Sequence, residues 1–166
     1  MHLILWDASG LVKRYSSEKG TATVNAVFVE VPFSDMAATP WGYLETYSIL
    51  RRRYHGGLMD FAVFTSAITT LQEELIQSRH FQFIPIPDSA IFAASSLIDT
   101  HHINSADAAI LSAYLQFRAR LPLNSPPCLL VAADRRLLRA AQAEGFATLN
   151  PETLAASDVS AFFAAL

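Results

Sequence analysis

The stretch LILWDASGLV, residues 3–12, decides how this sequence is expected to fold. Its first four residues are apolar, and an aspartate, Asp7, follows them directly. A short apolar run of this kind predicts a strand that is buried on both faces of a sheet. Apolar residues at helical spacing come next, so we expect the chain to leave the strand at Asp7 and to turn into a helix.

A second stretch near the carboxyl end repeats this arrangement. Residues 129–133 are apolar, Asp134 follows them, and residues 135–143 again show helical spacing. In open α/β sheets, ligands bind outside the carboxyl ends of the strands. We therefore expect Asp7 and Asp134 to emerge at the same edge of one sheet.

Strands and helices alternate along the rest of the chain. The spacing predicts helices at residues 20–30, 41–54, 58–78, 88–101 and 105–118, and short strands at residues 34–40, 81–86 and 146–149. Asp88 and Ser105 are the expected N-terminal caps of their helices, and Pro40 suits a helix start. The alternation predicts an α/β protein with a mostly parallel sheet covered on both faces.

The composition is that of a folded globular chain. Hydrophobic residues make up 52% and charged residues 16% of the 166 residues. The formal net charge is −3, so a polyanion would have to bind at a local basic patch. The single cysteine, the lack of a secretory signal pattern and the lack of a long apolar run predict a soluble protein of the cytoplasm, without a membrane span.

Two further acidic residues lie where they can join Asp7 and Asp134. Glu45 lies in the helix that begins at Pro40, and Asp107 lies in the first turn of a later helix. Each acid alone has an ordinary explanation, as a helix cap, as a partner of the helix dipole or as a solvated side chain. Four carboxylates at one edge would nevertheless repel one another, and a hard divalent cation is the simplest partner for them.

Basic residues accompany these acids along the chain. Eight of the twelve lysines and arginines lie on the segments that carry the acids, namely Lys13, Arg14, Arg51, Arg52, Arg53, Arg135, Arg136 and Arg139. They could frame an acidic metal centre with phosphate-binding groups, or they could form ordinary polar helix faces. Because consecutive residues on a helix diverge, at most two of the three residues 51–53 can reach a common ligand.

At these residues the chain resembles the PIN-domain nucleases, especially the VapC-type toxins of toxin–antitoxin systems. The resemblance rests on residues 5–13, on Glu45 in a helix ending in arginines, on residues 104–111 and on residues 130–138. It covers nearly the whole chain, and the blocks around Asp7 and Asp107 carry most of its specificity. One departure is Ala132-Ala133, where many members of the family carry Ser or Thr before the last aspartate.

The resemblance implies a three-layer α/β/α sandwich, a single PIN-like domain at residues 1–166, and Mg²⁺- or Mn²⁺-dependent endoribonuclease activity. The implied catalytic and metal-binding residues are Asp7, Glu45, Asp107 and Asp134, with Ser9 supporting Asp7 through its hydroxyl group. Arg52 is our candidate for a contact with the substrate phosphate. The alanines before Asp134 put the details of metal ligation in question more than the class of enzyme.

The resemblance also implies partners. A toxin of this kind acts on RNA and is restrained by a small antitoxin protein, and apolar surface on residues 41–54 and 58–78 would suit a homodimer or the antitoxin. The alternative from another class is a PIN-like module that binds RNA or protein without cleaving it. Other hydrolases fit less well, because the sequence has no P-loop, no nucleophile elbow and no second aspartate two residues after Asp7.

Overall fold

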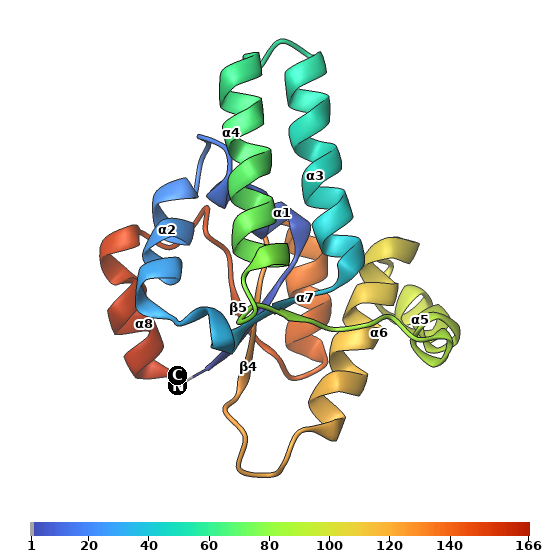
Figure 1. Ribbon diagram of the computed structural model, residues 1–166. Coiled ribbons are helices and arrows are strands. Elements are labelled where there is room, and N and C mark those ends of the chain that lie inside the picture. Colours follow the sequence, from blue (N-terminus) through green and yellow to red (C-terminus); the bar gives the residue numbers. More distant parts are fainter. Residues whose placement is uncertain (1) are drawn as a thin grey trace.

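The computed structural model describes residues 2–166 and contains within them one five-stranded sheet in which all neighbouring strands are parallel (Figure 1). The strands are β1 (Leu3–Trp6), β2 (Met36–Ala38), β3 (Gln82–Phe83), β4 (Cys128–Val131) and β5 (Ala147–Leu149). Their order across the sheet is β3-β2-β1-β4-β5. The chain thus builds outward from β1 to β3, then returns to add β4 and β5 on the other side of β1.

The two apolar runs that the sequence singled out form the centre of the sheet. In β1 and β4 every residue is buried, and Leu5 pairs with Leu130 while Trp6 pairs with Val131. Burial on both faces explains why neither strand alternates polar with apolar residues. The winding direction reverses between these strands, and such a switch point opens a crevice at their carboxyl ends.

Helices cover both faces of the sheet. One face carries α1 (Ala8–Leu11), α2 (Thr21–Glu30), α3 (Pro40–His55), α4 (Phe61–Gln72) and α8 (Val159–Ala165), with the 3-10 turns η1 (Val12–Arg14), η2 (Phe33–Asp35) and η4 (Ala156–Asp158). The other face carries α5 (Asp88–His101), α6 (Ser105–Arg120) and α7 (Arg135–Ala143). Within β1, Ile4 and Trp6 pack into the first layer and Leu3 and Leu5 into the second, which confirms the expected three-layer sandwich.

The pair α3 and α4 extends beyond the sheet as an antiparallel hairpin (Figure 1). We expected the second of these helices to begin at Leu58, but it begins at Phe61. Gly57 has a left-handed φ of 73°, Leu58 is exposed, and Asp60 caps the helix by accepting a hydrogen bond from the Val63 N–H at 2.8 Å. The last part of the expected helix, Glu73–Gln77, is a π-helical turn, η3. In residues 2–166 no helix has the length and apolar character needed to cross a membrane.

Three other expectations differ from the structure. The caps of α5 and α6 are Pro87 and Asn104, so the predicted caps Asp88 and Ser105 are instead the first helical residues. The strand expected at residues 81–86 is only two residues long, because the prolines at 85 and 87 remove N–H donors. It does lie at the sheet edge, as its prolines predicted. Helix α8 was not predicted from the sequence; it packs Phe162 and Phe163 against the first layer.

Candidate metal centre

Asp7 and Asp134 lie on either side of the switch point. The Asp7 N–H donates to the Val131 carbonyl at 3.0 Å, so Asp7 continues the pairing of β1 with β4 beyond the strands. Asp7 is almost fully buried and caps α1, and Asp134 caps α7 by accepting hydrogen bonds from the Arg136 and Leu137 N–H groups. Because α1 and α7 leave toward opposite faces of the sheet, both aspartates stay at the crevice between them.

Ser9 links these two aspartates. Its hydroxyl donates a short hydrogen bond to Asp7 Oδ2, and its Oγ lies 2.9 Å from the Ala133 N–H and 3.3 Å from the Asp134 N–H, which both donate to it. The Ser9 N–H also donates to Asp7 Oδ2 at 2.9 Å. The backbone before Asp134 thus supplies the link to Ser9, and no hydroxyl at positions 132 and 133 is needed for it.

The close approach of α1 to β4 requires a glycine. A Cβ atom on Gly10 would lie 2.8 Å from the Val131 carbonyl oxygen, which is closer than such atoms pack. With hydrogen alone at this position, the turn after Asp7 rests directly on the end of β4. The sequence DASG therefore brings the first aspartate and the last one to neighbouring positions.

Asp107 reaches the same edge from α6. Asn104 caps this helix, and the two residues bond reciprocally: Asp107 N–H to Asn104 Oδ1 at 2.9 Å, and Asn104 Nδ2 to Asp107 Oδ2 at 2.8 Å. Two turns further along α6, the buried Tyr114 hydroxyl donates to the Trp6 carbonyl at the end of β1 at 2.7 Å. This bond holds α6 against the strand that carries Asp7.

The pKa of Asp107 shows that the other acids lie near its carboxyl group. Burial and the charges of the other three acids raise the pKa of Asp107 from 3.8 to about 7, while Arg136 opposes the rise. A carboxyl group with this pKa is partly protonated at neutral pH. Shifts of this kind, caused by burial and by like charges, are typical of functional sites.

Glu45 comes from α3, on the opposite side of the sheet from α6. Thr39 caps α3 by accepting from the Gly42 N–H at 2.9 Å, which fixes the start of the helix directly after β2. Glu45 is half-buried; burial raises its pKa, the charge of Asp7 raises it further, and Arg52 lowers it. Glu45 therefore lies within electrostatic reach of Asp7.

The four predicted acids thus share one edge and influence one another. Burial also raises the pKa of Asp7, against the lowering effect of its hydrogen bonds with Ser9, and Asp134 adds to the rise. Within residues 2–166, however, no three Asp, Glu, His or Cys side chains are grouped as ready metal ligands. The donor chemistry does fit a hard cation, because all four side chains offer carboxylate oxygens and a positive charge would relieve their repulsion.

Four of the eight basic residues that accompany the acids in sequence have their partners elsewhere. Lys13 is buried and forms ion pairs with Glu18 at 3.1 Å and Glu152 at 2.7 Å. Arg14 pairs with Glu74 at 2.7 Å, and Arg53 pairs with Glu18 at 2.9 Å. The guanidinium group of Arg51 lies over the rings of Tyr54 and Phe64. These residues are structural partners and do not frame the acids.

Two arginines do influence the acidic edge. Arg52 lowers the pKa of Glu45 and donates to the Ser48 hydroxyl at 2.7 Å, one turn earlier on α3. Arg136, in the first turn of α7, lowers the pKa of Asp107. Both residues are among the basic residues that accompany the acids in sequence, but only Arg52 was predicted to contact a phosphate. The position of Arg136, two residues after Asp134, was the signal that could have identified it.

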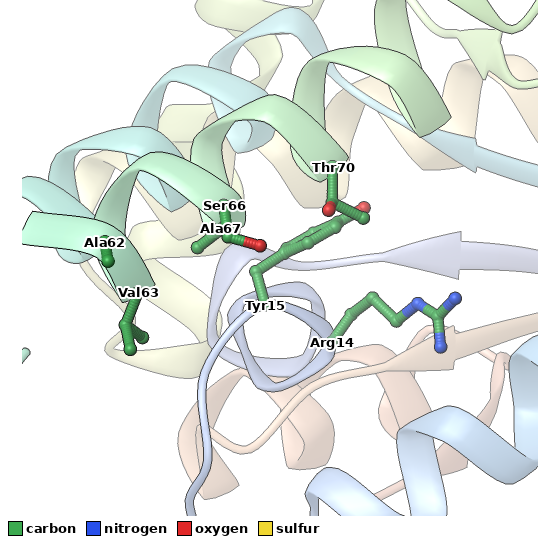
Figure 2. A pocket seen from close by; sticks show the side chains of 7 residues that line it. All are labelled: Arg14, Tyr15, Ala62, Val63, Ser66, Ala67 and Thr70. Atoms are coloured by element: carbon green, nitrogen blue, oxygen red, sulfur yellow. The ribbon is translucent and has the colours of Figure 1, made fainter.

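The pocket in Figure 2 belongs to another part of the molecule. It lies between α4 and the end of η1, where the Tyr15 ring extends toward Thr70 and Arg14 adds a further wall (Figure 2). None of the four acids lines it. The carboxylate edge, and not this pocket, is therefore the candidate site.

Comparison with known proteins supports the architecture. The fold is similar to the crystal structure of FitAcB from Neisseria gonorrhoeae, with a TM-score of 0.58, 16% sequence identity, and coverage of 91% of this chain and 99% of that chain. No protein-family model matches the sequence. No curated protein matches it either. The structural similarity confirms the expected PIN-like fold and carries no further statement about activity.

Proposed function

We propose that this protein is a metal-dependent endoribonuclease that hydrolyses RNA phosphodiester bonds with Mg²⁺ or Mn²⁺. The observation that carries the proposal is the gathering of four acids, far apart in sequence, at the switch point of a PIN-like sheet, where burial and neighbouring carboxylates raise the pKa values of Asp7, Glu45 and Asp107. Like charges held together in this way repel one another, and such arrangements are typical of functional sites.

Each side chain has a separate task in this proposal. Asp7, Asp107 and Asp134 would hold the cation, which when bound supplies positive charge that stabilises hydroxide and the charged transition state. Glu45 either joins them as a ligand or accepts a hydrogen bond from the attacking water and orients it. Ser9 keeps Asp7 in place, and Arg52 would contact the phosphate.

The finer part of the proposal is that the protein is a VapC-type toxin that acts in the cytoplasm. Co-expression with the protein of the adjacent reading frame tests this part. Its support is the sequence resemblance at residues 5–13, 104–111 and 130–138 together with the PIN-like fold. A small antitoxin would occupy the acidic crevice, and two copies of the toxin would pair. Finding no small partner that suppresses the activity would contradict this part alone.

A second function follows from one observation. Because no three acids are grouped as metal ligands within residues 2–166, a PIN-like module that binds RNA or protein without cleaving it is the competing candidate. Such a module would tolerate neutral side chains at the acidic positions, whereas a nuclease would not.

Cleavage of labelled single-stranded RNA by the purified protein distinguishes the two. We expect products with Mg²⁺ or Mn²⁺ and none with a chelator. Asp7→Asn should lower the rate on the order of 100-fold or more, because the charge of this buried side chain is lost at the reacting centre. Asp99→Asn, an exposed aspartate on α5, is the matched control and should cleave at the wild-type rate. Cleavage by Asp7→Asn at the wild-type rate would overturn the proposed role.

A further inference from the structure

A second concave surface lies directly beside the acidic edge. It is a pocket of about 360 Å³, formed where the start of α3, the chain before α5, α5 itself and the start of α6 meet. Its lining consists of Trp41, Ile86, Ile91, Ser105, Ala106 and Ala109. None of these side chains is charged, and the volume lies within the range of about 300–1,000 Å³ that is usual for small-ligand sites.

The pocket and the acids share two helices. Trp41 and Glu45 are four residues apart on α3 and therefore lie on the same face of that helix. On α6, Ala106 lines the pocket and directly precedes Asp107. A chain whose phosphate lies at the acids would therefore have its neighbouring unit at the pocket.

The indole of Trp41 forms the one aromatic wall. It is 53% exposed, whereas the only other tryptophan of the sequence, Trp6, is fully buried. In the part of the chain that the structure describes, the stacked and edge-on ring pairs do not involve Trp41. A large apolar ring left open to solvent beside a charged centre is a surface on which another flat group can stack.

We infer that this pocket binds a nucleobase of the single-stranded substrate, stacked on Trp41, next to the phosphate that is cleaved; the inference rests on the proposed nuclease function. An uncharged lining does not suit a phosphate but does suit a base, and every base has a π-face for stacking. The Ser105 hydroxyl, at the same wall, can form a hydrogen bond with a base edge. The other conceivable occupant, an apolar side chain of a protein partner, is an outcome of the test below.

Tryptophan fluorescence gives a direct readout of occupancy. Since Trp6 is buried, a soluble quencher and a stacking base should act on Trp41 alone. A single-stranded RNA oligonucleotide should quench this emission in the Asp7→Asn background, which slows turnover, and the same strand without bases should not. Quenching by both strands, or by neither, would overturn the inference, as would quenching by an apolar peptide in place of RNA.

Variants of Trp41 separate stacking from folding. Trp41→Ala should bind the oligonucleotide about five-fold or more weakly, since a stacked base contributes about 1–3 kcal/mol. Trp41→Phe should retain affinity to within about two-fold, because it keeps a ring. Phe61→Ala, an exposed aromatic at the far end of the α3–α4 hairpin, is the matched control and should bind as the wild type does. A thermal melt that matches the wild type shows that each variant is folded.

Cleavage assays of the same variants keep the two proposals apart. We expect Trp41→Ala to raise KM about five-fold or more and to change kcat much less, because stacking positions the substrate away from the reacting atoms. If Trp41→Ala cleaves RNA with unchanged KM and at unchanged positions, the nucleobase pocket is wrong and the nuclease stands. If the wild type cleaves no RNA with any divalent cation while still binding it through Trp41, the nuclease is wrong and the stacking surface stands.

Discussion

Two groups of acids in this molecule, most of them partly buried, have opposite surroundings. Around Lys13, hydrogen bonds from Arg53, Ser16 and Lys13 outweigh burial and lower the pKa of Glu18. At the carboxylate edge, burial and neighbouring acids raise the pKa of Asp107 to about 7. The first group has its positive partners built in and holds segments together. The second lacks enough of them, and that deficit is what makes it a candidate site.

Removing the cation from the first group should have the largest effect. Lys13→Met would leave Glu18 and Glu152 without their shared partner, and we expect the free energy of unfolding to fall by about 2–3 kcal/mol. Urea titration measures this loss. Lys19→Met, an exposed lysine nearby, is the control and should leave the midpoint unchanged. A Lys13→Met protein as stable as the wild type would contradict a structural role for this ion-pair group.

Removing the hydroxyl between the two aspartates should mainly affect activity. Ser9→Ala deletes the group that binds Asp7 and accepts from the backbone N–H groups of residues 133 and 134. We expect cleavage to slow about 10- to 100-fold, as for other groups that orient metal-binding side chains. Ser9→Thr keeps a hydroxyl and should recover part of the rate. Equal rates for the alanine variant and the wild type would show that this link has no role in the reaction.

The acidic edge should also control how stability depends on pH. The pKa of Asp107 rises from 3.8 to about 7 on folding, so the folded state binds more protons than the unfolded state between these values. Stability should therefore fall as pH rises from about 4 to about 7. Asp107→Asn should remove this part of the decline and raise stability by about 1–2 kcal/mol at pH 8. Thermal melts across this pH range check it; no difference between the two proteins would refute the shift.

The smallest effect expected is stabilisation by the metal itself. Mg²⁺ or Mn²⁺ at about ten times its Kd should add about 1.4 kcal/mol to the stability of the wild type. Asp7→Asn should respond much less, and Lys13→Met should respond as the wild type does. Calorimetry gives the stoichiometry directly. If no uptake of either ion is detected, the metal-dependent mechanism is untenable, whatever the fold.

The central strands and the helix after β4 could be predicted from the sequence, because they depend on residues that are close together in the chain. The apolar runs in β1 and β4 lack polar residues because both faces of each strand are buried, and this property is visible in the sequence. The positions of Asp7 and Asp134, directly after these runs, could be predicted in the same way. The helix at residues 135–143 was also predicted with its observed bounds.

Partners that lie far away in sequence could not be predicted. Lys13 follows Asp7 closely in sequence, yet it binds Glu152, which is 139 residues away, and Arg14 binds Glu74, which is 60 residues away. The direction of a long charged side chain depends on such neighbours and not on its own position in the helix. The shared edge of the four acids was predicted from the sequence. Their distances from one another were not, and no three of them are grouped closely as metal ligands.

The bond between Tyr114 and the Trp6 carbonyl has a consequence for mechanics. Tyr114 and Asp107 are seven residues apart, which is close to two turns and about 10 Å along α6. One buried hydrogen bond thus attaches the sixteen-residue helix α6 to the central strand, and the helix cannot shift along that strand without breaking it. The position of the Asp107 carboxylate at the sheet edge therefore depends on a contact in the protein interior, which solvent and surface substitutions do not reach.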